Sequence, residues 1–128
     1  MAKTAVRTEQ APAPFQGAPY SQAIKAGGFV FVSGQLGLAP GATEMVGTMI
    51  EEQTEQIFDN LEAILNEAGS GLDRIVKTTV FLISLDDFQG MNSVYARRVG
   101  ETPPARSTVE IGALPSGALV EIEAIAEV

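Results

Sequence analysis

The chain has 128 residues, with sixteen Asp and Glu against eight Lys and Arg, a formal net charge of −8, and neither histidine nor cysteine. This length is typical of one domain, which we assign to residues 1–128. The composition excludes disulfides, thiolate nucleophiles, sulfur metal sites and an imidazole base, so acid–base chemistry must use carboxylates, Tyr, Lys, hydroxyls or bound water. The acidity opposes binding to nucleic acid or anionic membranes and favours a cytoplasmic protein.

The first third of the chain predicts a lead-in, a hairpin and a long loop. Residues 1–18 are rich in proline and have no apolar signal core, so we expect a loosely ordered lead-in that becomes ordered near Tyr20. Two strands, over 21–25 and 29–33, flank a turn at 26–28. The second strand is apolar on both faces, which predicts a central place in a sheet. Glycines and a proline then indicate a long loop over 34–47.

Two amphipathic helices flank a β-branched strand. Thr48 with Glu51 three residues later has the spacing of a capping box, and the apolar repeat predicts a helix to about Ala68, ended by Gly69. Residues 75–83 are dense in β-branched residues, which favours a strand. A second helix is expected from Asp86 or Asp87 to about residue 99.

Two alternating strands close the chain, over 103–111 and 119–126, with turn residues between them. Arg106 and Thr108 share one face of the first strand, and Glu121 and Glu123 share one face of the second. A guanidinium near a carboxylate on a nearby strand would suit a small charged substrate. The order β-β-α-β-α-β-β predicts an α+β fold with both helices on one face of a mixed sheet, and the open face calls for a partner subunit.

Six short segments occur in an order and spacing that resembles the Rid family, the RidA or YjgF-like reactive intermediate deaminases. They are GAPYSQA (17–23), VSGQ (32–35), IVKTTV (75–80), Asp87-Phe88 with Met91-Asn92, PARS (104–107) and VEIEAIA (120–126). The resemblance implies a chorismate-mutase-like α+β subunit, a homotrimer with sites in the clefts between subunits, and no metal or cofactor. It implies an enzyme of the 2-iminobutanoate/2-iminopropanoate deaminase type, which hydrolyses enamines and imines such as 2-aminoacrylate to a 2-keto acid and ammonia.

The same resemblance assigns the site residues. Arg106 is expected to bind the substrate carboxylate, Glu121 to position or deprotonate water and move a proton, and Tyr20 to close the cleft. Four further residues are expected to bind substrate, and these are Thr108, Ser33, Gly34 and Asn92. Many relatives have cysteine where this chain has Thr108, which leaves the reaction type intact but affects substrate preference.

Each of these residues also has a plainer interpretation. Arg106 would otherwise be a surface arginine paired with a glutamate, Glu121 part of a solvated strand face, and Tyr20 a packing residue. The alternative function is a non-catalytic binder or sensor of 2-keto acids that uses the same cleft. RNA cleavage fits poorly with the acidity and the lack of histidine.

Overall fold

The computed structural model describes residues 2–128, and Met1 lies outside the described part. One six-stranded sheet has the order β1-β2-β3-β6-β4-β5. The strands are β1 Thr4–Val6, β2 Ala23–Ala26, β3 Phe29–Gln35, β4 Ile75–Leu82, β5 Ala105–Glu110 and β6 Val120–Glu127, and the helices are α1 Ile50–Glu67 and α2 Phe88–Arg98. Only the β4–β5 pair is parallel, so the sheet is mixed.

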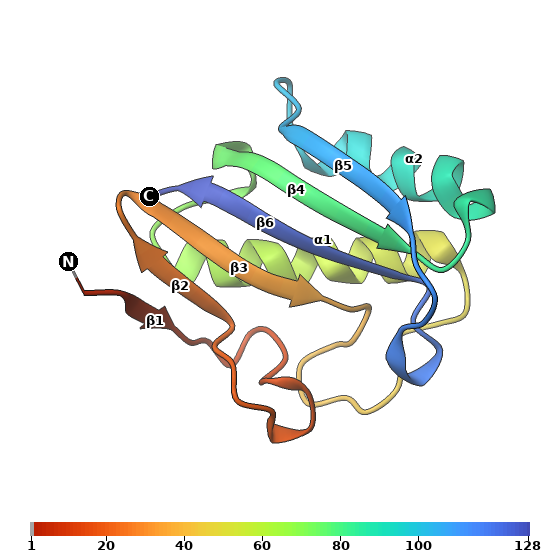
Figure 1. Cartoon of the computed structure of the whole chain (residues 1–128), viewed down its shortest axis with the longest axis horizontal. Coiled ribbons are helices and arrows are strands. Elements are labelled where there is room, and N and C mark those ends of the chain that lie inside the picture. The colour runs from red at the N-terminus through yellow and green to blue at the C-terminus, as the bar shows by residue number, and fades with distance from the viewer. Residues whose placement is uncertain (1) are drawn as a thin grey trace.

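Both helices lie behind the sheet in Figure 1, and the other face is open toward the viewer. The expected α+β class, with two helices on one face of a mixed sheet, is therefore confirmed. The helix side holds the main core, in which Phe58, Leu61 and Ile64 of α1 pack against Val80 and Ile122 of the sheet. Strand alternation produces this arrangement, because every second residue of β6, from Val120 to Ala126, faces the helices.

The N-cap of α1 lies one residue later than the predicted Thr48, and the helix begins at Ile50. The N-cap residue is Met49, and its backbone N–H donates to Glu52 Oε1 at 3.1 Å, so Glu52 rather than Glu51 reaches back to the helix start. The predicted end is confirmed: Gly69 follows the helix with φ +82°, and the next N–H, of Ser70, donates to the Leu65 carbonyl at 2.8 Å. The Asn60 amide secures the long loop by donating to the carbonyls of Leu36 and Leu38.

The proline-rich lead-in is more ordered than the sequence suggested. Residues 4–6 form β1, which pairs antiparallel with β2 at the edge of the sheet. The buried amide of Gln22 accepts from Thr8 N–H at 2.8 Å and donates to the carbonyls of Thr8 at 3.0 Å and Pro12 at 2.8 Å. Local sequence does not reveal such pairing, because its partners lie 10 to 14 residues away.

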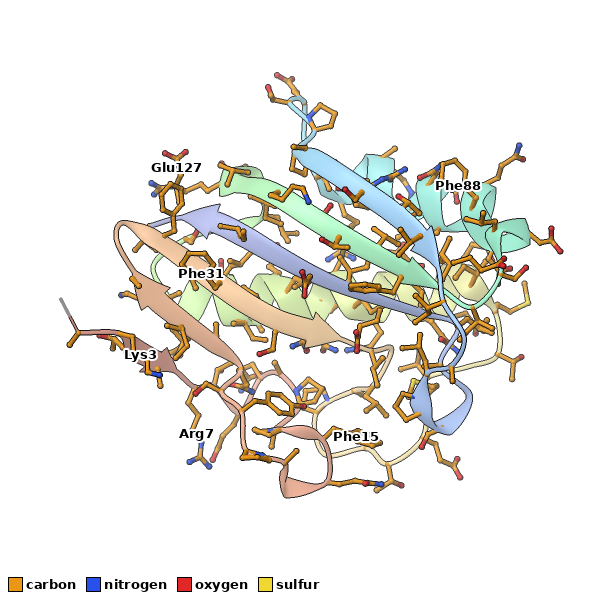
Figure 2. The ribbon with its side chains drawn as sticks, viewed as in Figure 1. Lys3, Arg7, Phe15, Phe31, Phe88 and Glu127 are labelled. Carbon is orange, nitrogen blue, oxygen red and sulfur yellow. The ribbon has the colours of Figure 1, made fainter. Side chains whose placement is uncertain are left out.

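The open face carries partly exposed aromatic side chains. Phe29 and Phe31 of β3 are 40% and 44% exposed, while Val30 and Val32 between them are buried. The central position of β3 is as predicted, although only one of its faces lies in the core of the subunit. Figure 2 shows Phe31 on the open side of the sheet. Within residues 2–128, no helix has the length and apolar character needed to cross a membrane.

Candidate active site

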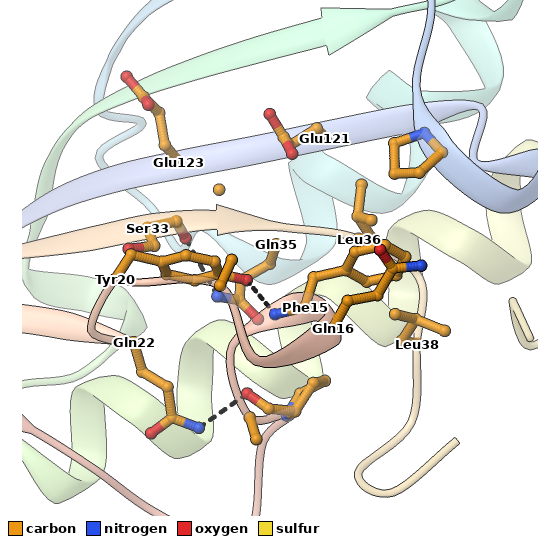
Figure 3. A pocket seen from close by; sticks show the side chains of 15 residues that line it. Phe15, Gln16, Tyr20, Gln22, Ser33, Gln35, Leu36, Leu38, Glu121 and Glu123 are labelled. Atoms are coloured by element: carbon orange, nitrogen blue, oxygen red, sulfur yellow. Dashed lines mark hydrogen bonds between the residues drawn. The ribbon is translucent and has the colours of Figure 1, made fainter. Parts of the chain in front are cut away.

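A cavity of about 650 Å³ opens beside β3 and β6 and is also lined by residues of the lead-in, Pro12 to Ala18. Four of the predicted residues line it, namely Tyr20, Ser33, Gly34 and Glu121. Figure 3 shows Tyr20 and Ser33 on the lower side and Glu121 and Glu123 on the strand above. Apolar side chains such as Phe15, Leu36 and Leu38 supply part of the remaining wall, and polar side chains, including Gln22, Gln35 and Glu123, supply another part. The cavity therefore combines carboxylates with both polar and apolar wall residues, as small-molecule sites commonly do.

Glu121 is one of the two carboxylates that line this cavity, together with Glu123. Burial raises the pKa of its carboxyl, and the negative charge of Glu123 on the same strand face raises it further. No cation of residues 2–128 forms an ion pair with Glu121. A carboxyl with a raised pKa keeps its proton to a higher pH than an ordinary glutamate and is the stronger base once ionised, which suits it to acid–base work.

Ser33 and Gly34 lie at an irregularity of the sheet. The register between β3 and β6 shifts between Val32 and Gln35, so these two residues have no Cα partner on β6. β-bulges of this kind redirect the chain near functional sites. The Glu121 side chain fills the space that results, since a Cβ on Gly34 would lie 2.7 Å from Glu121 Cδ. Gly34 is thus required by the close approach of Glu121.

The two hydroxyl groups near the cavity already have partners. Ser33 Oγ donates to the carbonyl of Ser21 at 2.6 Å, and Tyr20 Oη accepts from the Phe15 N–H at 2.5 Å. The phenol of Tyr20 still has its own proton to donate, because the bond to Phe15 uses an oxygen lone pair. Tyr20 is 44% exposed and therefore stands at the mouth of the cavity.

Arg106, Thr108 and Asn92 lie elsewhere in the subunit. Arg106 pairs in register with Thr78 of β4, on the helix side of the sheet, whereas Glu121 pairs with Phe81 on the open side. Arg106 Nη1 donates to Asn92 Oδ1 at 2.8 Å, and Thr108 follows two residues later on the same face. Strand β4 separates the strands of Arg106 and Glu121. Within a single subunit, Arg106 and Glu121 therefore lie on opposite faces of the sheet.

The predicted residues thus form two half-sites, a carboxylate half around Glu121 and a guanidinium half around Arg106. Arg106 forms no ion pair with any carboxylate of residues 2–128, so its charge is available to an anion. The plainer interpretation of Arg106, a surface arginine paired with a glutamate, is therefore not what the structure shows. Within this part of the chain, no group of His, Cys, Asp and Glu is arranged to hold a metal ion.

Three contributors to these half-sites were not recognised in the sequence. Gln22 anchors the lead-in that forms one wall of the cavity. The rings of Phe88 and Tyr95 both contact the guanidinium of Arg106, with ring centres 5.6 Å and 4.7 Å from its carbon. The sequence signal was present but ambiguous: Phe88, Asn92 and Tyr95 are spaced i, i+4, i+7, which places them on one helix face, and the two aromatic residues fit a core stripe equally well.

The fold is that of a small α+β protein with a cavity on the open face of the sheet and, on the helix side, an arginine that forms no ion pair within residues 2–128. The sequence matches the family described as Endoribonuclease L-PSP over residues 8–128. It is 50% identical over 126 residues to a RutC family protein of Pyrococcus abyssi, with 98% of each chain covered. It is 47% identical over 124 residues to the chloroplastic Reactive Intermediate Deaminase A of Arabidopsis thaliana, covering 97% of this chain and 65% of the relative.

Solved structures agree with the sequence comparison. The Rid protein YyfA of Yersinia pestis has a TM-score of 0.93 and 45% sequence identity, with 99% of this chain and 100% of that chain covered. The chain belongs to the Rid family, as the six short segments indicated, and family membership supports a deaminase role in general.

Proposed function

We propose that this protein hydrolyses reactive 2-imino acids and their enamine tautomers, such as 2-aminoacrylate, to a 2-keto acid and ammonia. The observation that carries the proposal is the pair of complementary half-sites. One offers a guanidinium with no carboxylate partner among residues 2–128, and the other offers a carboxyl of raised pKa that lines a cavity. An imino acid has the matching features, because it carries a carboxylate at one end and an electrophilic carbon next to it.

The reaction follows from these groups. Arg106 binds the carboxylate through two parallel N–H donors, a geometry that lysine does not offer. Proton transfer to the β-carbon converts the enamine to the imine, and water then adds to the C=N carbon. The resulting carbinolamine expels ammonia and leaves the 2-keto acid, so one water is consumed for each ammonia released. Glu121 positions the water and transfers protons, and the elevated pKa of its carboxyl supports that role.

The two half-sites lie on opposite faces of one sheet, so a complete site requires a second copy of the chain. We propose that the β5 edge of one subunit, which carries Arg106, packs against the open sheet face of its neighbour, in the homotrimer that the family resemblance implies, so that Arg106 faces Glu121 of the neighbouring copy. The exposed aromatic residues of the open face, including Phe31, support this packing. Tyr20, Ser33, Gly34 and Thr108 complete the cleft in this arrangement. The cytoplasmic location stays a prediction.

RNA is a poorer candidate for the substrate, although the matched family description names an endoribonuclease. The net charge is −8. The adjacent pair Arg97 and Arg98 is already engaged by Glu55 and Asp59 at 2.7–2.9 Å, so these arginines are not free to neutralise phosphates.

The test is a coupled assay in which an amino-acid lyase generates 2-aminoacrylate and its loss is followed with and without the protein. We expect acceleration by the wild type, and a fall in kcat/KM of roughly 100-fold or more for Arg106→Ala. Arg74→Ala, which removes an exposed arginine in the turn before β4, is the matched control and should retain full activity. Unchanged activity in Arg106→Ala would overturn the assignment.

The alternative, a non-catalytic 2-keto acid binder, makes a different prediction in the same experiment. For the enzyme, Glu121→Gln should abolish acceleration while 2-ketobutyrate still binds. A wild-type protein that binds 2-ketobutyrate but accelerates no imine, small or branched, would establish the binder.

A further inference from the structure

The Arg106 side chain lies against one face of α2 that three residues form. Its guanidinium carbon is 4.7 Å from the ring centre of Tyr95 and 5.6 Å from that of Phe88, and Nη1 donates to Asn92 Oδ1 at 2.8 Å. We call these three residues, Phe88, Asn92 and Tyr95, the guanidinium cradle. Their spacing of four and then three residues brings them onto a single stripe of the helix.

The cradle attracts the cation without neutralising it. Aromatic faces attract a guanidinium through the ring quadrupole, and the attraction strengthens where water is partly excluded. A guanidinium has five N–H donors, and the described residues offer Arg106 one hydrogen bond, the bond to Asn92. The positive charge is therefore held in place while most of its donors stay free for a carboxylate.

Tyr95 is itself held by Thr78 of β4 and Phe58 of α1. It is 5% exposed, its Oη lies 2.6 Å from Thr78 Oγ1, and its ring meets Phe58 edge-on at 5.5 Å between centroids. Thr78 is 1% exposed and pairs in register with Arg106 on the neighbouring strand. The hydroxyl bond thus ties the Tyr95 ring to the strand beside the arginine that it supports.

We propose that Tyr95, held by Thr78, is a positioning residue that orients Arg106 for the substrate carboxylate, with Phe88 as the second wall. This inference rests on the proposed function, since the anion is the imino acid of that reaction. The structure also gives Asn92 a specific part, because its amide oxygen already accepts from Arg106 and so orients the guanidinium. The cradle sets carboxylate affinity, whereas the chemistry at the C=N carbon belongs to the other half-site around Glu121.

The test compares substitutions in the cradle with a matched buried control. Tyr95→Leu and Phe88→Leu remove one ring each, and Tyr95→Phe, Thr78→Val and the double variant remove the hydroxyl bond. Thr54→Val is the control, because Thr54 is also fully buried and also donates one hydroxyl bond, to the Ile50 carbonyl at 2.7 Å, on α1 away from Arg106. The readouts are KM and kcat for 2-aminoacrylate loss, the dissociation constant of 2-ketobutyrate, and the melting temperature.

We expect Tyr95→Leu to raise KM and to weaken 2-ketobutyrate binding by about tenfold, with kcat changed much less. Tyr95→Phe and Thr78→Val should each raise KM by a smaller factor. The double variant should do no worse than either, because both groups act through one bond. Thr54→Val should lower the melting temperature and leave KM unchanged.

The outcomes separate this inference from the proposed function. A wild-type protein that neither accelerates imine loss nor binds 2-ketobutyrate overturns the proposed function, and the inference with it. An active wild type, with KM unchanged in Phe88→Leu and in Tyr95→Phe, overturns the inference alone. If Tyr95→Leu fails to fold, these two milder variants still decide the question.

Discussion

Replacing Gly34 by alanine tests the link between the bulge of β3 and the carboxyl of Glu121. The added Cβ would lie 2.7 Å from Glu121 Cδ and 2.9 Å from both Cγ and Oε1. To reach a van der Waals distance of 3.4 Å, the carboxyl must move by about 0.7 Å. Misplacing a catalytic group by about 1 Å costs on the order of 100-fold in rate, so we expect kcat to fall by roughly 10- to 100-fold.

The same substitution should change stability far less than activity. Overpacking usually costs about 1–3 kcal/mol of stability. We expect a cost at the lower end of this range, because the half-buried Glu121 side chain can rotate toward solvent. The assay is imine loss, with melting temperature measured at one protein concentration. Gly112→Ala is the matched control, since no atom lies within 4 Å of its added Cβ.

A second background isolates the contact itself. In a Glu121→Ala protein, Gly34→Ala should leave the melting temperature nearly unchanged, because the clashing atoms are gone. If the single Gly34→Ala variant has the kcat and melting temperature of the wild type, the reasoning that glycine is required at this position by the approach of Glu121 is refuted.

Three further predictions concern stability. Burial holds the pKa of Glu121 above its ordinary value, so its contribution to folding is fully present below the unfolded pKa and is lost as pH rises through the folded pKa. Glu121→Gln should therefore have a higher melting temperature than wild type at pH 7, and this gain should disappear by about pH 4. A gain that does not depend on pH would contradict this cause. Asn60→Leu removes both donors to the Leu36 and Leu38 carbonyls and should lower the unfolding free energy by roughly 2–4 kcal/mol in urea titrations; a loss under half of that would show that these carbonyls find other partners. Gln22→Leu should release the lead-in, seen as faster amide exchange at Thr8 and as proteolysis before residue 20 while α1 stays protected, and unchanged exchange there would show that β1 alone holds the segment.

Most of the fold could be predicted because its elements have local signals. The 18-residue apolar repeat of α1, the β-branched run of β4 and the glycine after α1 each depend on neighbouring residues. β1 has no such signal, since three residues are too few to show a period and its order comes from pairing with β2. The start of α1 was misplaced because Thr48 and Glu51 match the capping-box pattern in the sequence, whereas in the structure it is Glu52 that accepts from the N-cap N–H.

The sequence indicated which residues share a face of one strand, but not how the faces of different strands are arranged. Alternation indicates which residues of one strand share a face, and it correctly grouped Arg106 with Thr108 and Glu121 with Glu123. It does not indicate whether two strands present those faces to the same side. That depends on β4 lying between β5 and β6 and on each pairing register, both of which are set by nonlocal contacts.

Mixing two inactive variants tests the central claim most directly, namely that Arg106 of one subunit works with Glu121 of another. Arg106→Ala and Glu121→Gln are each assayed alone, then unfolded together in equal amounts, refolded and assayed for loss of 2-aminoacrylate. Random assembly would give about one site in four with both residues intact, so activity should recover to roughly a quarter of wild type. A refolded mixture no more active than the separate variants would contradict a shared site and place the whole chemistry within one chain.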